Sequence, residues 1–245
     1  MTVFAGFDRI RIINLPSRQD RRADMMGELR RLGIDADPRV QFVDGVVVDD
    51  MSPWRSYGEK GVFLAHLGIL RDAAASGESV LILEDDVDFT AAAGTWNLPE
   101  GCDVAYGGYE ATDPSHLEAS DIVGAHCMGF SASAVRALVP FLEKLLDHPS
   151  PPPIDGAYVW FRRQAAGLVT DFARPVVAMQ RPSMSDIARG RLDTNPLLRL
   201  PLQLARRTKR SLTRGSLTFG LREAVILSIA GTAIGGIAAY FHVAR

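Results

Sequence analysis

The stretch Ser79–Phe89, SVLILEDDVDF, decides how we interpret the rest of the chain. It begins with the apolar run VLIL, and a short apolar run is typical of a strand that is buried on both faces of a parallel sheet. The run leads directly into three adjacent carboxylates, Glu84, Asp85 and Asp86. Adjacent carboxylates repel one another and burial raises their pKa values, so they require water or a cation. Two interpretations follow: a solvated acidic turn, or a site for a hard divalent ion such as Mg²⁺ or Mn²⁺ that also binds phosphates.

Strand and helix patterns alternate on both sides of this stretch. Strands are predicted over residues 9–15, 40–48, 79–83, 103–106, 125–130 and 175–179, and helices over residues 18–32, 59–75, 132–146 and 154–166. This alternation predicts an α/β domain with a mainly parallel central sheet. In such a sheet ligands bind beyond the carboxyl ends of the strands, which is where the three carboxylates fall.

The composition fits a globular protein with a distinct C-terminal part. The 245 residues, 47% of them hydrophobic, suit one sizeable domain and a little more. The two cysteines, Cys102 and Cys127, are far apart, which favours a reducing compartment and argues against a disulfide framework or a zinc site. The chain also has no P-loop and no nucleophile elbow.

The net charge of −2 hides an asymmetry, because residues 189–222 contain nine Lys or Arg and one acid. Residues 224–241, AVILSIAGTAIGGIAAYF, then carry no charge over 18 positions. As a helix this segment would span about 27 Å, close to the roughly 30 Å of bilayer hydrocarbon. Its basic flank would lie at the anionic cytoplasmic surface of the membrane. The alternative is a helix rich in glycine and alanine that is buried in the domain or in a dimer interface.

We therefore expect three parts: a catalytic or binding domain over residues 1–188, a basic juxtamembrane segment over 189–222 and a membrane-associated C-terminal helix over 223–245. The domain would lie at the cytoplasmic face of the cell membrane. Nucleic acid is not an expected partner, because the basic segment lacks interleaved aromatic residues and leads directly into the apolar tail.

Several short motifs, taken in order, resemble glycosyltransferase family 25, the lipopolysaccharide-type glycosyltransferases. The most specific is LILEDDV at residues 81–87. The others are IINL at 12–15 followed by Arg18, Arg21 and Arg22, GVFLAHL at 61–67, AHCMGFS at 125–131, PID at 153–155, and Gln180 with SDI at 185–187. The resemblance covers residues 9–188. Val62 and Ala65 stand where the family has Cys and Ser, and Cys127-Met128 replaces an aromatic position.

The resemblance implies a GT-A type nucleotide-sugar-binding fold and a metal-dependent, inverting transfer of a sugar. The donor would be a nucleotide-sugar, a UDP-hexose, and the acceptor a lipopolysaccharide or another envelope glycan or glycolipid. The implied cofactor is Mn²⁺ or Mg²⁺, with Asp86 as the first metal ligand and Glu84 as the second. Glu84 and Asp85 would also hold metal-bound water or nucleotide hydroxyls.

The resemblance also suggests residues around the donor. Asn14 and Arg21 would meet the base, ribose or phosphate, because the end of the first strand commonly contributes to a nucleotide pocket. His66 would face the donor sugar or the diphosphate, and Ser185 with Asp186 would close over the donor. Each residue also has a structural alternative. Asn14 would form a turn, Arg21 would be solvated and His66 would be a hydrogen-bonded core residue. Ser185 and Asp186 would be an ordinary capping pair.

An inverting transfer needs a general base for the acceptor hydroxyl, and Asp155 is the candidate. It follows a stiff proline run and precedes a helix with Tyr158, Trp160 and Phe161, which would stack on sugars or pack in the core. The alternative role of Asp155 is a helix N-cap. A second function class is a non-catalytic, membrane-tethered module that binds carbohydrate or nucleotide on a degenerate version of the fold, which the substitutions at Val62 and Ala65 keep open.

Overall fold

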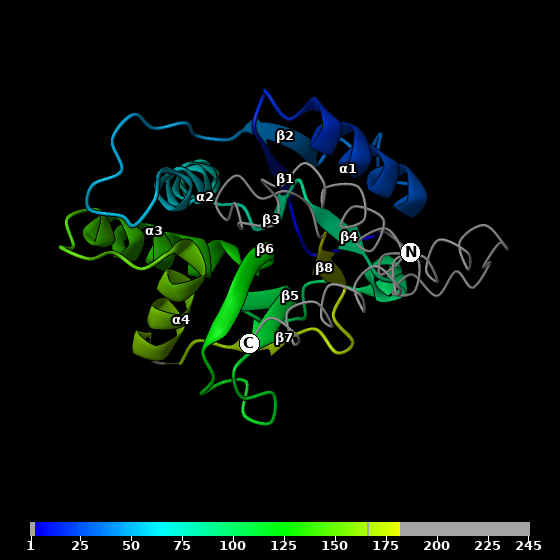
Figure 1. Ribbon diagram of the computed structural model, residues 1–245. Coiled ribbons are helices and arrows are strands. Elements are labelled where there is room, and N and C mark those ends of the chain that lie inside the picture. Colours follow the sequence, from blue (N-terminus) through cyan, green and yellow to red (C-terminus); the bar gives the residue numbers. More distant parts are fainter. Residues whose placement is uncertain (1–2, 166, 182–245) are drawn as a thin grey trace, which may run out of the picture. The chain divides into compact units, whose positions relative to one another are not determined.

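A computed structural model describes residues 3–165 and 167–181, which belong to one compact unit ending at Arg181 (Figure 1). The elements are β1 (Arg9–Asn14), α1 (Gln19–Leu32), β2 (Val40–Asp44), α2 (Tyr57–Ser76), β3 (Val80–Glu84), β4 (Val87–Phe89), the 3₁₀ helix η1 (Ala91–Thr95), β5 (Val104–Ala111), β6 (Ile122–Phe130), α3 (Ala132–Leu146), α4 (Ile154–Gln164), β7 (Thr170–Phe172) and β8 (Ala178–Gln180).

Six strands form the central sheet in the order β2-β1-β3-β6-β5-β7. Strands β2, β1 and β3 are parallel, β6 runs antiparallel to both β3 and β5, and β7 is parallel to β5. Only β6 therefore opposes the common direction, and the prediction of a mainly parallel central sheet is confirmed. Strands β4 and β8 form a separate two-stranded antiparallel sheet.

Strand β3 is buried on both faces, as its apolar run predicts. Val80 and Ile82 pack in the hydrophobic cluster shared with α2, α3 and α4. Leu81 and Leu83 point the other way, into the cluster formed with α1, β4 and residues near the N-terminus. All four side chains are fully buried. The alternation of a strand thus places apolar side chains in two cores, one on each face of the sheet.

Local signals explain where the helices begin and end. The Ser56 hydroxyl accepts a hydrogen bond from the Glu59 amide at 3.1 Å and so caps α2. The Ser131 hydroxyl caps α3 in the same way, through the Ala134 amide at 3.1 Å. Helix α2 ends at Gly77, whose φ of 69° is the left-handed conformation that favours glycine.

Several strand boundaries differ from the prediction. Strand β2 ends at Asp44 rather than at residue 48, because the Gly45 amide makes the last bond to β1, at the Asn14 carbonyl. Strands β5 and β6 are longer than expected, since they pair with each other up to Ala111 and Ile122. Strands β4 and β7 were not predicted, because three residues are too short to show a period.

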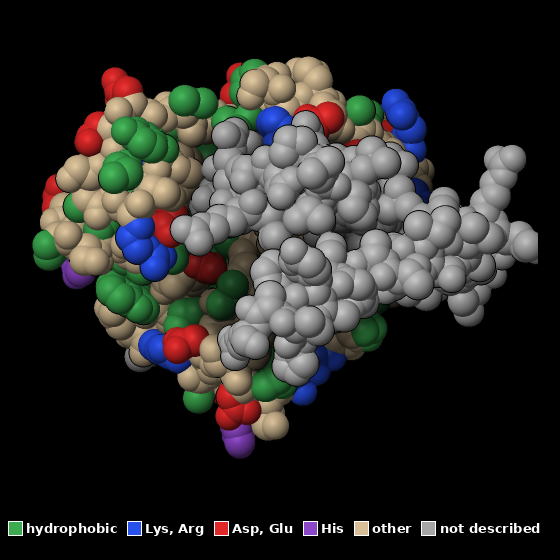
Figure 2. All heavy atoms as spheres, in the orientation of Figure 1, with side chains coloured by type: hydrophobic (Ala, Val, Ile, Leu, Met, Phe, Trp, Pro, Cys, Tyr) green, Lys and Arg blue, Asp and Glu red, His purple; other side chains and the backbone are tan. Residues whose placement is uncertain are grey.

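No helix among the described residues is long and apolar enough to cross a membrane. The predicted segments 189–222 and 223–245 lie outside the described residues, and so do Ser185 and Asp186. On the face that Figure 2 shows, acidic and basic side chains are interspersed with hydrophobic ones, and the acidic side chains are not gathered into one patch there.

Candidate functional site

The ends of β1 and β3 bring the first two predicted residues together. Ile13 is paired with Glu84, so the residues that follow, Asn14 and Asp85, lie side by side at the carboxyl edge of the sheet. The Asn14 side-chain amide donates a hydrogen bond of 2.7 Å to Asp85 Oδ2. Asn14 is only 3% exposed and Asp85 5%, so this bond is made inside the protein rather than at its surface.

Arg21 reaches the same edge from α1, because a tight turn joins β1 to this helix. The turn is closed by the Arg18 amide, which donates to the Leu15 carbonyl at 2.8 Å. Arg21 Nη1 then lies 2.9 Å from Asp85 Oδ1 and 3.4 Å from Asp86 Oδ2. Both oxygens of Asp85 are therefore engaged by protein donors, and one guanidinium group spans two of the three carboxylates.

Asp86 differs from Asp85 in the hydrogen bonds that its two oxygens make. Its Oδ2 accepts a long hydrogen bond of 3.4 Å from Gln180, whereas its Oδ1 is buried and has no hydrogen-bond partner among the described residues. Burial and then the charge of Glu84 raise the pKa of Asp86 to about 7, against the opposing charge of Arg21. A buried carboxylate oxygen without a partner among the described residues is unusual, because buried acceptors are normally hydrogen-bonded.

Glu84 faces the other side of the sheet, toward α2. His66 Nε2 lies 3.9 Å from Glu84 Oε1, which is too far for a hydrogen bond, and His66 Nδ1 is hydrogen-bonded to the Tyr158 hydroxyl at 2.8 Å. Burial works to raise the pKa of Glu84, but the neighbouring imidazoles of His66 and His126 and the charge of Arg21 lower it. Glu84 is therefore held ionised while Asp86, two residues on, tends to keep a proton.

His126 is a further member of this site. Leu83 is paired with Cys127 across β3 and β6, which brings the preceding residue of β6, His126, next to Glu84. Its Nε2 lies 3.4 Å from the Ala178 carbonyl, and its Nδ1 is buried without a partner among the described residues. Burial lowers the pKa of His126, so the ring is held neutral. Gly108 makes room for this ring, since a Cβ there would clash with His126 Nε2 and the Ala178 carbonyl.

The sequence does not predict a role for His126 at this site, and it singles out Tyr158 only as a residue that would stack on sugars or pack in the core and Gln180 only as part of a family motif. Their positions depend on the pairing of β6 with β3, on the packing of α4 and on the β4–β8 pairing, none of which follows from local sequence patterns. The sequence does contain one indication of this residue, because His126 is a polar side chain within an apolar strand.

Asp155 lies in the first turn of α4 and is bonded to the backbone. Its Oδ1 accepts from the Gly156 amide at 2.8 Å, and its Oδ2 accepts from the Gly124 amide of β6 at 3.1 Å. The N-cap of α4 is Pro153, so Asp155 does not serve as the cap. Within the described part of the chain, no hydrogen bond or ion pair joins Asp155 to the three carboxylates at the end of β3.

The nitrogen, oxygen and sulfur atoms near the three carboxylates determine which kind of metal site is possible. Among residues 3–165 and 167–181, no three His, Cys, Asp or Glu side chains gather as an all-protein metal site would require. Mg²⁺ and similar ions are commonly held by one or two carboxylates together with substrate phosphates and water. Asp86 and Glu84 could supply that smaller donor set: Asp86 Oδ1 has no hydrogen-bond partner among the described residues, and the charge of Glu84 acts on it although the Glu84 side chain faces α2.

Neither the models of known protein families nor the curated proteins include a match to this chain. The functional assignment therefore depends on the residues and on their geometry.

Proposed function

We propose that this protein binds a nucleotide-sugar together with a divalent cation and transfers the sugar to a hydroxyl group of an envelope glycan. The observation that carries the proposal is the buried Oδ1 of Asp86, which has no hydrogen-bond partner among the described residues and lies at the carboxyl edge of a mainly parallel sheet, close enough to Glu84 for that charge to raise its pKa. The resemblance of residues 9–188 to glycosyltransferase family 25 supports the same conclusion and suggests that the α/β domain has the GT-A type of fold.

Asp86 and Glu84 are the proposed ligands of Mn²⁺ or Mg²⁺. When bound, the ion would act as a Lewis acid that offsets the negative charge developing on the leaving nucleoside diphosphate. Asp86 has the higher pKa of the two, so ion binding there would displace a proton. The affinity for the ion should therefore rise as the pH increases toward about 7, where Asp86 ionises on its own.

The neighbouring residues have distinct proposed roles. Asn14 and Arg21 fix Asp85 through two short hydrogen bonds, which pre-organises the edge for nucleotide hydroxyls and phosphates. Arg21 also contributes positive charge close to the proposed diphosphate. His66 is fully buried, is oriented by the Tyr158 hydroxyl and faces Glu84, so its proposed role at the donor site is to orient Glu84.

Asp155 is the proposed base that accepts the proton of the acceptor hydroxyl. The two backbone amides that bind it fix the direction of its carboxylate, and each oxygen retains a lone pair for a further hydrogen bond. Ser185 and Asp186 are proposed to contact the donor. Residues 189–222 and 223–245 are proposed to attach the domain to the cytoplasmic face of the cell membrane, where a lipid-linked acceptor would be found.

The test is calorimetric titration of the full chain with UDP, with Mn²⁺ and with both together. We expect UDP and Mn²⁺ to strengthen each other's binding, and Asp86→Asn to abolish this coupling. Asp35→Asn, which alters an exposed carboxylate in the loop that follows α1, is the matched control and should leave the coupling intact. Independent binding of the two ligands, or coupling that survives in Asp86→Asn, would falsify the proposed donor site.

Transfer is measured separately, as metal-dependent release of UDP from UDP-hexoses in the presence of membrane glycolipids. Asp155→Asn should reduce turnover about 10²-fold or more while leaving UDP binding unchanged, as expected for loss of a general base. Coupled binding of UDP and Mn²⁺ without turnover of any nucleotide-sugar would instead identify the non-catalytic module.

A further inference from the structure

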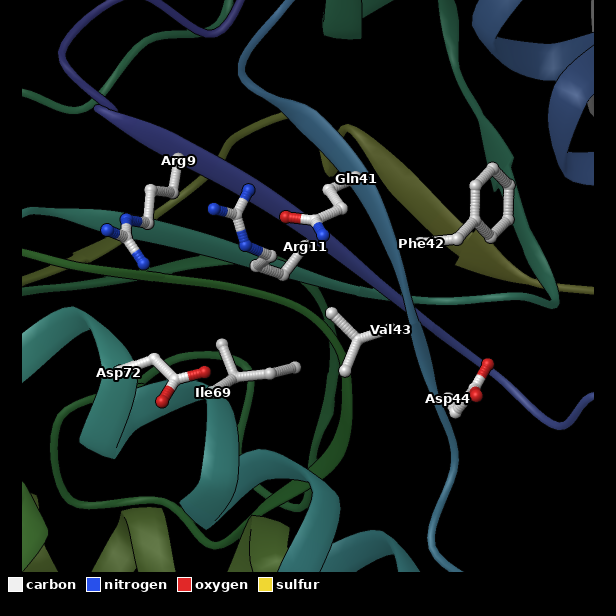
Figure 3. A pocket seen from close by; sticks show the side chains of 8 residues that line it. All are labelled: Arg9, Arg11, Gln41, Phe42, Val43, Asp44, Ile69 and Asp72. Carbon is white, nitrogen blue, oxygen red and sulfur yellow. The ribbon is translucent and has the colours of Figure 1, made fainter.

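A cavity lies at the β2 edge of the sheet, and none of the three carboxylates lines it. It has a volume of about 400 Å³ and lies between β1 and β2 on one side and α2 on the other (Figure 3). Its polar lining comes from Arg9, Arg11, Gln41 and Asp72, and Val43 and Ile69 form apolar walls; a second carboxylate, Asp44, lines the end of the cavity away from Arg9. Its volume is within the roughly 300–1,000 Å³ that is typical of small-molecule sites.

The strand register explains why two guanidinium groups meet here. Arg9 and Arg11 are separated by one residue on β1, so their side chains lie on the same face of the sheet, which is the face covered by α2. Arg11 is paired with Gln41 on the parallel edge strand β2, which adds an amide beside the guanidinium groups. Figure 3 shows the side chains of these three residues above Ile69 and Asp72 of α2.

The protein leaves most of these donors available. Arg9 uses its Nε in an ion pair with Glu78, and Arg11 uses its Nη1 for the carbonyls of Ile10 and Arg39, at 3.2 and 2.9 Å. The described residues supply no hydrogen-bond partner for the two terminal nitrogens of Arg9 or for Nε and Nη2 of Arg11. Burial and then the like charge of Arg9 lower the pKa of Arg11, against the opposing charges of Glu78 and Asp72. A bound anion would relieve this repulsion and satisfy the remaining donors.

The other walls of the cavity restrict what kind of anion fits. Val43 and Ile69 offer an apolar surface, and the carboxylate of Asp72 faces the cavity and accepts hydrogen bonds but repels a second negative charge. A bare, highly charged anion would therefore fit less well than an anion on a hydroxylated ring, whose hydroxyl groups donate to Asp72 and whose apolar face covers the two aliphatic side chains.

We propose that this cavity binds a sugar-sized molecule that carries one carboxylate or phosphate group, with the anionic group held by Arg9 and Arg11 and the hydroxyl groups held by Gln41 and Asp72. The cavity shares no residue with the proposed donor site, so the proposal does not depend on the glycosyltransferase assignment.

The test is calorimetric titration of the full chain with four probes: glucuronate, glucose 6-phosphate, glucose and inorganic phosphate. We expect at least one of the two sugar anions to bind about tenfold more tightly than both glucose and inorganic phosphate. Binding should weaken as salt is added, because the contact is between charges. Comparing glucuronate with glucose 6-phosphate identifies whether the site selects a carboxylate or a phosphate.

Substitutions of the two arginines test whether the sugar anion binds in this cavity. Arg9→Gln and Arg11→Gln should each weaken binding of the preferred sugar anion about tenfold, whereas Arg30→Gln, which removes an exposed arginine of α1, should not change it. If Arg11→Gln does not fold, Arg9→Gln tests the proposal instead, because the Arg9 side chain is partly exposed and, among the described residues, is bonded only to the Glu78 side chain. Equal affinity for glucose, displacement by UDP with Mn²⁺, or unchanged binding in Arg9→Gln would each overturn the proposal, and so would the absence of binding by both sugar anions.

Discussion

Asp85 and Asp86 are neighbours in sequence but differ in what the protein does with their oxygens. Asp85 is engaged at both oxygens by Asn14 and Arg21, at 2.7 and 2.9 Å. Asp86 has one buried oxygen without a partner among the described residues and a pKa raised to about 7. The sequence shows three equivalent acids. Asn14, Arg21 and Gln180 distinguish Asp85 from Asp86, and His66 with His126 distinguishes Glu84 from both; all these positions depend on tertiary packing.

Asp86 should make the stability of the metal-free protein fall as the pH rises. Its folded pKa of about 7 exceeds its ordinary value of 3.8, so between these two values the folded state binds more protons than the unfolded state, and stability is lost across that window. We expect Asp86→Asn to be more stable than the wild type at about pH 8, by roughly 1–3 kcal/mol, with a smaller difference near pH 4. Urea denaturation without divalent ions, at several pH values, measures this.

The matched control for this experiment is Asp35→Asn, whose exposed carboxylate should contribute little at any pH. If the wild type is equally stable near pH 4 and at about pH 8, then Asp86 ionises in the folded protein at no cost in the free energy of unfolding. A variant that is less stable than the wild type at every pH would show that the Arg21 interaction outweighs the cost of burial.

At the scale of elements, the sequence was most informative where a pattern repeats over many residues. Helix α3 begins and ends at the predicted residues 132 and 146, and β3 has the predicted double burial. The short strands β4 and β7 were missed, and so was the extent of the β5–β6 pairing, because hydrogen bonds to distant partners determine them rather than a local period. His126 was omitted from the site for the same reason.

The close approach of Gly61 in α2 to the Val46 carbonyl tests whether the β2–α2 connection is fixed against this helix. A Cβ on Gly61 would clash with the Val46 carbonyl, whereas a Cβ on Gly68 of the same helix would meet nothing within 4 Å. We expect Gly61→Ala to lower the free energy of unfolding by about 1–3 kcal/mol, because backbone atoms must shift to accommodate the methyl group. Gly68→Ala should leave stability unchanged or raise it by up to about 1 kcal/mol, since alanine is the better helix former.

Thermal and urea unfolding of the two variants provide the measurement. Equal effects of the two substitutions would mean that the Val46 carbonyl moves away at no cost and that the connection is not fixed at Gly61. Because His66 lies further along the same helix, a shifted α2 should also weaken UDP binding in Gly61→Ala if the proposed donor site is correct.

At the scale of the whole described unit, its last residue joins parts that are far apart in the sequence. The Arg181 backbone amide donates to the Asp86 carbonyl at 2.6 Å. Its side chain, 6% exposed, forms ion pairs with Asp88 of β4 at 2.9 Å and with Asp24 of α1 at 3.1 Å. The separate β4–β8 sheet is thereby tied to α1 and to the carboxylate turn. No periodicity or motif predicts this contact, because the two ion pairs join Arg181 to residues more than 90 positions away.

Replacing this arginine should therefore destabilise the entire unit rather than a local loop. We expect Arg181→Met to lower the free energy of unfolding by about 3 kcal/mol, because the buried carboxylate of Asp88 loses its ion pair with Arg181. Arg71→Met removes an exposed pair with Glu143 between α2 and α3 and should cost less than about 1 kcal/mol. Adding Asp88→Asn to Arg181→Met should restore part of the lost stability, since the buried charge is then removed as well. Additive losses in the double variant, measured by urea denaturation, would mean that the two side chains stabilise the fold through packing and not through their charges.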